Sequence, residues 1–464
     1  MAGQQAIECV GPSEWLRDQK TAVQRSVNCY PMAAGVAGAQ RLVLESAPGL
    51  ELAYDFGAPI RGMRSADGRF FIAAGGDLYE MNSAGGIAGR GSLASSSGYV
   101  SMTNGEGQLA IVDGSILSVF DFNSSSLSTV AASGWLGSRA VEFLDGYFIF
   151  VEPSTERFYV SAIDDATAID ALDFSSADTQ PDNIIAHVVT RRELYLIGLR
   201  STEVWINSGG ADFPFVRYQG TPIDVGAVGY RAACSAGDGV VMVGQSMTGG
   251  PYVYQLQAYQ PVRISTQAIE QQLEASTDIT QTRMWTYQEA GSEFVAVWAP
   301  GMATAWVWDA ATKLWHERGE LVNGDWTPSR VEHVAYFQGQ HYAAGGSKLY
   351  RMSRRYNSLA GDPLVRERTW AHLVSPSLEP TRYTSLELRC TTGSEAEGSI
   401  TLESSNDGGS VFGAPLRRSL GVVGQRGHRV RWMALGTCPA GGSRVFRLRC
   451  TDAVPLTIQG AVIA

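Results

Sequence analysis

The sequence has very little lysine and no cysteine pair at metal-binding spacing. Lysine occurs only at Lys20, Lys313 and Lys348, and every other basic residue is arginine. Arginine makes better bidentate interface contacts than lysine, although codon bias in a GC-rich genome also explains this composition. Without a C-x-x-C pair, the scattered cysteines exclude a zinc ribbon and a small disulfide scaffold, so we expect mostly reduced, buried thiols. The six cysteines are Cys9, Cys29, Cys234, Cys390, Cys438 and Cys450.

Long apolar runs are also absent. No stretch approaches the 18 or more apolar residues that a membrane-spanning helix needs, so we expect no membrane anchor. The first residues, MAGQQAIECVGPSEWLRDQK, lack a basic segment followed by an apolar one, which argues against a secretory signal peptide. These features predict a protein made in a cytoplasm.

The residues that are abundant favour β-structure. The chain has 464 residues, of which 44% are apolar and 18% charged, a balance that excludes a disordered protein. Its 52 glycines, 11 tryptophans and 18 tyrosines favour short strands joined by tight turns over long helices.

Charge is distributed unevenly along the chain. The net charge of −10 argues against a protein that binds nucleic acid over its whole surface. Residues 1–353 carry 22 basic against 37 acidic residues, a net of −15, whereas residues 354–464 carry 14 against 9, a net of +5. Such asymmetry indicates two surfaces with different partners.

A β-hairpin pattern recurs between residues 58 and 353. FIAAGGDLYEM at 71–81 and HYAAGGSKLYRM at 341–352 each combine an apolar strand, a Gly-Gly turn and a second strand with Leu-Tyr. Looser copies begin at residues 108, 147, 194, 240 and 294. Many are preceded by a further apolar strand, as in IRGMRS, YVSMTN, RAVEFLD and VEHVAYF.

This repeat length predicts a β-propeller. One strand, one hairpin and one connecting strand in every 40–50 residues correspond to one blade. We count seven blades, with six as the alternative, and a less regular array of β-sandwiches as the competing fold. RLVLES or LELAYDF, which precede the first unit, is a candidate to complete the last blade. RISTQAIEQQLEAS at 263–276 has helical spacing and predicts a helix between blades.

The remaining segments predict a second domain. From about residue 364, alternating runs such as SLELRC and RVFRLRC are separated by turn residues, which is typical of an antiparallel β-sandwich. Arginine alternates with apolar residues there, so one face of the sheet is expected to be basic and either solvated or an interface. We therefore divide the chain into an extended N-terminal segment (1–57) that packs on the sandwich, a propeller (58–353) and a C-terminal sandwich or platform domain (354–464).

No motif indicates catalysis, a cofactor or a metal. Ser246 in GQSMTG lacks the spacing of a nucleophile elbow, and Trp315-His316-Glu317 is not an H-E-x-x-H motif. The Gly345–Lys348 segment lies inside a hairpin and is not a phosphate-binding loop. We interpret each dispersed histidine as a strand or loop residue. They are His187, His316, His333, His341, His372 and His428.

One acidic cluster also has a plain structural interpretation. Asp164, Asp165, Asp170 and Asp173 lack the turn glycine of a cation-binding loop, so we expect a solvated connection between blades. We predict no catalytic, cofactor-binding or metal-binding residues. The sequence does not indicate which residues would form a binding site. A propeller hydrolase would assemble its acids and arginines only in space, and the sequence does not exclude one.

Several stretches together resemble one protein family. QPDNII at 180–185 precedes RRELYLIGLRSTEVWINSG and then Phe213-Pro214-Phe215. PVRIST at 261–266, Asn406-Asp407-Gly408, RVRWMALG and a final PLTIQGAVI follow in order, and VNCYP and APGL come early. This order resembles the tail nozzle, or packaged-DNA stabilisation, proteins of short-tailed bacteriophages (podoviruses).

The resemblance implies a structural virion protein in the phage tail. Such proteins form a homo-hexameric ring below the portal and its adaptor, conduct double-stranded DNA, help to retain the packaged genome, and dock tail fibres or tailspikes and in some phages a needle or plug. The residues leave two alternatives open: a receptor- or glycan-binding propeller, and a propeller hydrolase. Lectin propellers usually repeat a binding motif in each blade, whereas the polar positions differ here from copy to copy.

Overall fold

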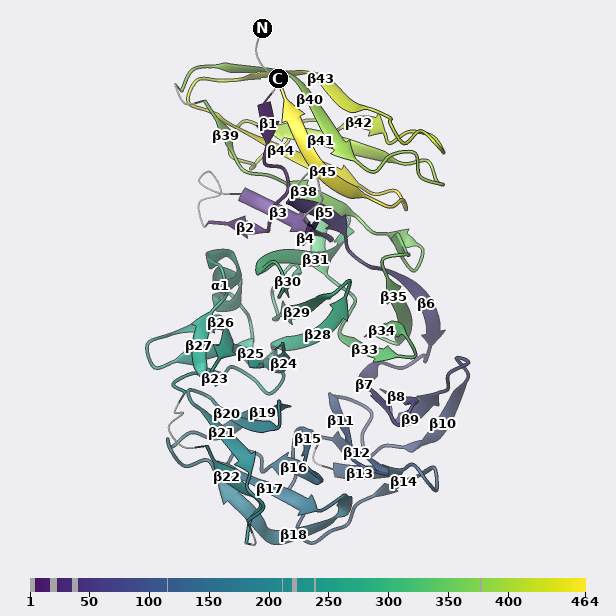
Figure 1. The fold of residues 1–464 in the computed structure, drawn as a ribbon, viewed down its shortest axis with the longest axis vertical. Helices are drawn as coiled ribbons and strands as arrows, with labels where there is room; N and C mark the ends of the chain where they lie inside the picture. Colours follow the sequence, from purple (N-terminus) through teal and green to yellow (C-terminus); the bar gives the residue numbers. More distant parts are fainter. Residues whose placement is uncertain are drawn as a thin grey trace.

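The computed structural model shows two β-domains stacked along one axis. It describes residues 5–16, 23–35, 41–114, 116–210, 212–218, 223–237, 239–375 and 378–464. In Figure 1 a ring of blades fills the lower part of the view, and a sandwich that carries the C-terminus lies above it. The predicted all-β class, propeller and sandwich are confirmed.

The first four blades are four-stranded antiparallel sheets in simple chain order. Their strands are β7 (Ile60–Ala66), β8 (Arg69–Ala74), β9 (Asp77–Met81) and β10 (Ile87–Ser92); β11 (Val100–Asn104), β12 (Gln108–Asp113), β13 (Ile116–Asp121) and β14 (Ser126–Thr129); β15 (Val141–Leu144), β16 (Tyr147–Val151), β17 (Arg157–Ala162) and β18 (Asp165–Ser176); and β19 (Ile184–Thr190), β20 (Glu193–Gly198), β21 (Thr202–Asn207) and β22 (Phe215–Arg217).

Three further sheets complete the ring. Their strands are β23 (Gly226–Ala227), β24 (Ala233–Ala236), β25 (Gly239–Ser246), β26 (Gly249–Gln257) and β27 (Gln260–Arg263); β28 (Arg283–Glu289), β29 (Ser292–Trp298), β30 (Ala305–Asp309) and β31 (Leu314–Val322), with β32 (Asp325–Pro328) beside β31; and β33 (His333–Phe337), β34 (Gln340–Gly345) and β35 (Lys348–Ser353) with β6 (Gly49–Asp55). The innermost strands contact one another in the order β7, β11, β15, β19, β24, β28, β33, and β33 contacts β7 again. The ring is therefore closed and has seven blades.

The last blade combines strands from both ends of the propeller. β6 pairs antiparallel with β35, so that Leu50 lies opposite Met352. The sheet continues through β36 (Ser358–Leu359), which pairs with β6, and β37 (Asp362–Pro363). Since β6 comes from the start of the chain, it holds the first and last blades together and protects the edge of β35.

Tight turns join the inner strand to the second strand in most blades. Asp67-Gly68, Asp145-Gly146, Ala290-Gly291 and Gln338-Gly339 each have positive φ at both residues. That conformation defines a type I′ turn, whose twist matches the twist of the flanking strands. The hairpins predicted from the sequence form the second and third strands of the blades.

The predicted helix is present between the fifth and sixth blades. α1 (Gln267–Glu274) buries Ala268, Ile269 and Leu273 and packs on β26 and on β2 (Glu14–Trp15). It is the only α-helix among the described residues, and a short 3-10 turn (Ile279–Gln281) follows it. No helix in the described part of the chain is long and apolar enough to cross a bilayer.

Two sheets form the sandwich, and both include strands from the first 46 residues. One contains β1 (Gln5–Ile7), β4 (Cys29–Ala33), β5 (Leu42–Ser46), β40 (Thr381–Cys390), β43 (Val430–Cys438) and β45 (Thr457–Ile463). The other contains β3 (Val23–Val27), β38 (Arg366–Thr369), β39 (Leu373–Val374), β41 (Ser399–Ser405), β42 (Leu416–Ser419) and β44 (Ser443–Cys450). Trp432, Leu386 and Phe446 lie at the centre of the apolar core between them.

Two local predictions are wrong. Asp165, Asp170 and Asp173 belong to β18, the outer strand of the third blade, and do not form a connection between blades. The reason is that Ala166 and Ile169 of the same run are buried and anchor it as a strand. The predicted Gly-Gly turn is present in the first hairpin but not in the final one. There Gly345 is the last residue of β34, and the turn is Gly346-Ser347.

Candidate functional site

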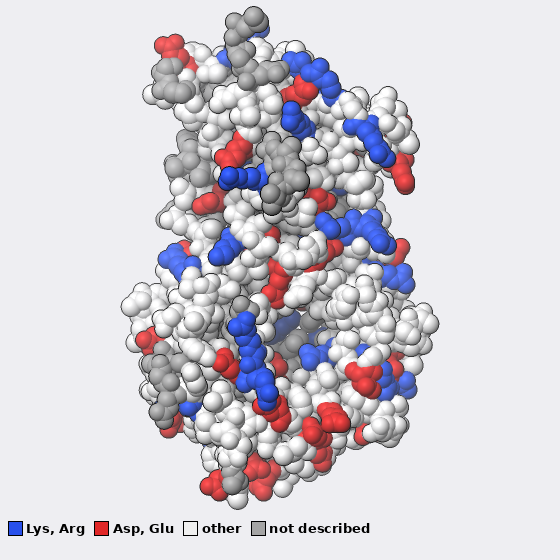
Figure 2. All heavy atoms as spheres, viewed as in Figure 1, with Lys and Arg blue, Asp and Glu red and all other residues white. Residues whose placement is uncertain are grey.

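The seven inner strands surround a polar cavity of about 570 Å³. Figure 2 shows the ring hollowed at its centre, with basic and acidic side chains around the rim of the hollow. Every blade contributes to the lining, because each inner strand runs along the same axis. The charged residues of the lining are Arg64, Glu142, Arg231 and Glu332.

An aromatic and basic stack lies in this channel. The guanidinium of Arg231 lies 4.2 Å from the centre of the Tyr99 ring. The Tyr99 ring is also parallel to the His333 ring, with 6.0 Å between ring centres. Burial, with help from Arg231 and Arg283, lowers the pKa of His333 to about 3, so its imidazole is neutral at pH 7. Burial also lowers the pKa of Arg231 itself.

The two carboxylates of the channel have different environments. Glu332 is bonded to Arg283, 2.6 Å away, at one end of the inner strand β28. Glu142 makes no ion pair with any described residue, and burial raises the pKa of its carboxyl to about 7, although Arg64 opposes the shift. Within the described residues, no group of three or more His, Cys, Asp or Glu could hold a metal ion.

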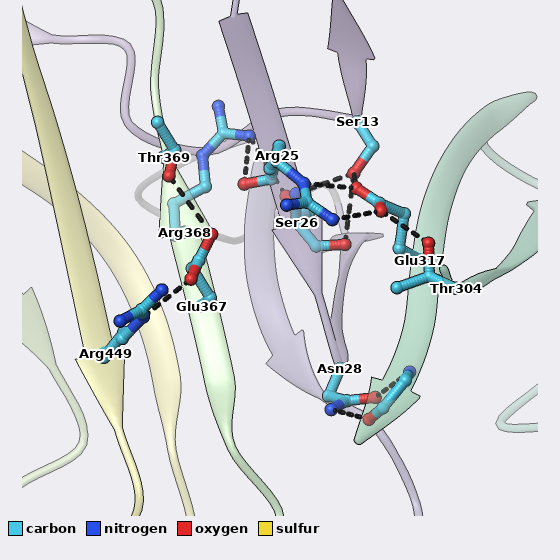
Figure 3. Close-up of polar contacts among 11 residues, drawn as sticks. Ser13, Arg25, Ser26, Asn28, Thr304, Glu317, Glu367, Arg368, Thr369 and Arg449 are labelled. Atoms are coloured by element: carbon cyan, nitrogen blue, oxygen red, sulfur yellow. Dashed lines mark hydrogen bonds and ion pairs between the residues drawn. The ribbon is translucent and has the colours of Figure 1, made fainter. Parts of the chain in front are cut away.

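The second notable region is the junction between propeller and sandwich. The outer strand β31 of the sixth blade pairs in parallel with β3, β3 pairs with β38, and β38 pairs with β44 of the sandwich. One continuous sheet therefore passes from a blade into the sandwich. The close-up in Figure 3 shows these strands side by side with the polar side chains between them.

Glu317 is the central polar residue of the junction. Its carboxylate is fully buried and accepts hydrogen bonds from Ser13 Oγ at 2.9 Å and Thr304 Oγ1 at 2.7 Å. Arg25 donates two more, from Nε at 3.1 Å and Nη2 at 2.6 Å (Figure 3). Four donors from three separate segments thus stabilise one buried charge.

Asn28 and Arg368 continue the network on either side. The Asn28 amide donates to the carbonyl oxygens of Gly319 and Val365, both at 2.8 Å, and so joins propeller to sandwich directly. Arg368 is buried and donates to the Cys9 carbonyl at 2.7 Å. Burial lowers the pKa of Arg368 to about 10, still well above neutral pH.

Comparisons with protein families identify both domains. Residues 20–354 match the family described as bacteriophage P22 Gp10, β-propeller, and residues 369–464 match bacteriophage P22 Gp10, β-sandwich. The chain belongs to the P22 Gp10 family. The resemblance to tail nozzle and DNA-stabilisation proteins is thereby confirmed, and membership places the chain among phage tail proteins.

Comparison with other proteins adds little beyond the Gp10 family. No curated protein matches the chain. Similar solved structures include the N-terminal domain of Nup159, with 9% identity, a TM-score of 0.42, and coverage of 75% of this chain and 99% of that one. The extracellular domain of the one-component system BT4673 from B. thetaiotaomicron has 10% identity and a TM-score of 0.43, over 73% of this chain and 43% of that one. YCF48 bound to D1 peptide has 11% identity and a TM-score of 0.42, over 66% of this chain and 94% of that one.

The arginines of β44 in this Gp10-family sandwich do not form the open basic face expected from the sequence. Arg447 lies 2.6 Å from Glu403, and Arg449 lies 2.7 Å from Glu367. Arg444, which alternates with apolar residues in the same run, is itself buried and donates to Asn406. The expectation of a basic face on this strand is wrong because glutamates of neighbouring strands pair with the arginines.

The remaining residues considered from the sequence have structural surroundings. His316 is buried beside Tyr30 and Phe294, and His372 bonds Ser443. Ser246 shares a hydrogen bond with Thr248 in a hairpin. All six cysteines are free thiols, four of them buried.

His187 and His333 are exceptions, because both line the channel. Sequence reasoning treated them as ordinary strand residues and did not select Tyr99, Glu142 or Arg231. A signal was present: each inner strand is the apolar run before a repeated hairpin, as in YVSMTN and VEHVAYF. Residues that begin or border these runs meet around the axis once the blades form a ring.

Proposed function

We propose that this chain is one subunit of a hexameric tail nozzle of a short-tailed bacteriophage. In this role six copies form a ring below the portal and its adaptor, conduct double-stranded DNA, help to retain the packaged genome and dock tail fibres or tailspikes, with a needle or plug as a further partner. The protein is made in the host cytoplasm and acts in the virion tail. Its role is structural and not enzymatic.

The observation that carries this proposal is the continuous sheet through the junction. A wall subunit must transmit force between its partners without bending at a linker. Here β3 lies between β31 of the propeller and β38 of the sandwich. At the same place the buried Glu317 carboxylate accepts hydrogen bonds from neighbouring segments. Flexible linkers are the usual boundary between domains, so such a junction favours a rigid structural part.

The channel supports a non-catalytic role. Glu332 forms an ion pair with Arg283, and burial and Arg64 are the influences on the Glu142 carboxyl, with no hydrogen bond from a described serine, threonine or cysteine. Nucleophilic catalysis needs a nucleophile within hydrogen-bond reach of a base. The described residues of the channel therefore lack the hydrogen-bonded nucleophile and base of an acyl-transfer hydrolase, which supports a non-catalytic role.

The acidic propeller favours a surface that DNA slides past. Residues 1–353 have a net charge of −15, and six copies would repel the phosphate backbone. Each phosphate contact would add affinity and slow passage. A duplex that bound tightly to the assembled ring at physiological salt, through arginines of the lumen, would contradict this part of the proposal.

Mass photometry of the purified chain with its portal adaptor ring tests the assembly. We expect a species of six copies on the adaptor, which adds about 300 kDa, six times the 49.9 kDa of one chain. The matched control is the chain without adaptor. A chain that remains monomeric and does not associate with the adaptor ring would overturn the nozzle assignment.

A further inference from the structure

The propeller channel is basic although the propeller as a whole is acidic. Of its four charged lining residues, Glu332 is already bonded to Arg283 outside the lining. Arg64 and Arg231 remain, opposed only by Glu142, whose carboxyl titrates near neutral pH. The interior therefore favours a negatively charged occupant.

Arg231 has the surroundings of an anion ligand. Its guanidinium is fixed against the Tyr99 ring at 4.2 Å and makes no ion pair with any described carboxylate. A largely buried charge without a counter-ion is costly, because neither water nor a carboxylate compensates it fully. A guanidinium fixed by stacking is pre-organised to bind a carboxylate or phosphate through two parallel hydrogen bonds.

The rest of the wall offers hydroxyl groups. Ser101 and Thr103 of β11, Ser235 of β24 and Thr286 of β28 line the same cavity. Ser101 Oγ already accepts from the backbone N–H of Val141 and Ser235 Oγ donates to Thr190, and each hydroxyl oxygen keeps further hydrogen-bonding capacity. Hydroxyl side chains both donate and accept hydrogen bonds, so they suit a ligand that carries several hydroxyl groups of its own. The cavity of about 570 Å³ lies in the range of small-molecule sites and is much larger than a bare inorganic anion needs.

His187 is a second observation in the channel wall. It is 94% buried (6% exposed), lines the cavity, and its Nε2 has no hydrogen-bond partner among the described residues. Burial lowers the pKa of His187 to about 4, so the ring is neutral at pH 7. Native proteins rarely leave buried polar atoms unsatisfied, so an unpartnered polar nitrogen marks this part of the channel wall.

We propose that the propeller channel binds an acidic sugar, with its carboxylate or phosphate on Arg231 and its hydroxyl groups on the serine and threonine side chains of the wall. This assignment is independent of the nozzle role, because it concerns the channel inside one subunit and not the lumen of the ring. A single subunit therefore suffices for the test.

Isothermal titration calorimetry on the full chain tests the proposal. The probes are glucuronate and glucose 6-phosphate, with neutral glucose and inorganic phosphate as comparisons. We expect saturable binding of at least one acidic sugar, and affinity at least about tenfold lower for glucose because the charge-assisted bonds are lost. Glucuronate and glucose 6-phosphate distinguish the carboxylate from the phosphate as the recognised group.

Three variants locate the site. Arg231→Gln should weaken binding by about tenfold or more. Arg200 is an exposed propeller arginine outside the lining, and Arg200→Gln should change the affinity less than about twofold. Glu142→Gln should strengthen binding, since it removes the opposing carboxylate. This gain keeps the proposal testable even if the Arg231 variant fails to fold.

Four results would overturn the proposal. They are an absence of saturable binding to the folded wild-type chain up to about 20 mM probe, equal affinity for glucose and the acidic sugars, equal affinity of the wild type and a folded Arg231→Gln variant, and weaker binding by Glu142→Gln. Inorganic phosphate that binds as tightly as glucose 6-phosphate would show an unspecific anion site and would also count against it.

Discussion

Glu317 shows how a single buried charge joins parts of the chain that are far apart in sequence. Its four hydrogen bonds come from Ser13, Arg25 and Thr304, two of which lie about 300 positions away. Burial opposes the charged form of Arg25, yet Glu317 raises the pKa of that guanidinium. Arg25 is therefore charged at neutral pH, and removal of the Glu317 carboxylate leaves this guanidinium without its ion-pair partner.

We predict that Glu317→Gln lowers the free energy of unfolding by about 3–5 kcal/mol, the usual cost of breaking a buried, hydrogen-bonded ion pair. Urea unfolding at pH 7 measures this. The control is Glu387→Gln, whose partner Arg429 is largely exposed, and which should cost less than about 1 kcal/mol. Equal losses for the two variants would show that the junction pair adds nothing specific.

His187 predicts a pH dependence of stability. Its pKa is lowered from 6.5 to about 4 by burial, with a backbone hydrogen bond at Ile149 as a weaker opposing influence. Between pH 6.5 and pH 4 the unfolded chain binds a proton that the folded chain does not. The contribution of His187 to the free energy of unfolding is therefore fully present above pH 6.5 and falls as the pH drops to about 4. The loss is roughly 3 kcal/mol at most, because one pKa unit corresponds to about 1.36 kcal/mol.

His187→Gln should remove this part of the pH dependence. We expect the difference in unfolding free energy between wild type and variant to shift in favour of the variant from pH 7 to pH 4. Carboxylates that titrate in the same range contribute equally to both proteins and cancel in the difference. A difference that stays constant with pH would mean that the pKa of His187 is the same in the folded and unfolded chains, and it would contradict the prediction.

Residue patterns in the sequence were a poor guide to the channel for a clear physical reason. Tyr99, Glu142, Arg231 and His333 lie in four different blades, and each looks like an ordinary residue in its own segment. Only ring closure brings them together. By contrast, the prediction that His316 is a strand or loop residue required no long-range information, and this residue lies in β31.

Among the elements, β6 is the strand that closes the propeller. It pairs with β35 through residues about 300 positions apart, so its contribution is a long-range contact that the rest of the blade cannot replace. Leu50 of this strand is 2% exposed and packs against Tyr350 and Met352, whereas Leu52 is 47% exposed.

We predict that Leu50→Ala destabilises the chain by about 2–4 kcal/mol, because it removes buried methyl groups and leaves a cavity in the last blade. Leu52→Ala on the same strand is the matched control and should change stability by less than about 0.5 kcal/mol. Chemical denaturation of both variants compares them. If both leucines cost the same, β6 would not be packed as a core strand.

The sequence predicted elements well where the signal was local. Hairpins such as 71–81 were found because alternation and a turn glycine lie within a dozen residues, and α1 was found from its helical spacing. The Asp164–Asp173 segment was misread because its aspartates obscured the buried Ala166 and Ile169. The position of β3 between β31 and β38 had no local signal, since its partners lie about 290 and 340 residues away.

At the scale of the whole molecule, the two domains share their strands. β1, β4 and β5 belong to one sandwich sheet and β3 to the other, yet all four precede the propeller in the chain. The propeller is therefore an insertion between the N-terminal strands and the rest of the sandwich. β3 and β38, which flank the inserted domain in the chain, pair with each other in the junction sheet, so the two domains form one mechanical unit.

This arrangement predicts that residues 354–464 do not fold alone. The isolated fragment lacks β1, β3, β4 and β5, so it exposes the edges of β45 and β38 and part of the apolar core. A fragment that joins residues 1–48 to residues 364–464 through a flexible Gly-Ser linker restores these strands and should fold.

Circular dichroism and thermal unfolding measure both fragments. We expect a cooperative transition only for the joined fragment, because its two sheets have all their strands. A sharp transition for residues 354–464 alone would show that the N-terminal strands are an accessory layer and that the propeller and sandwich are separable domains.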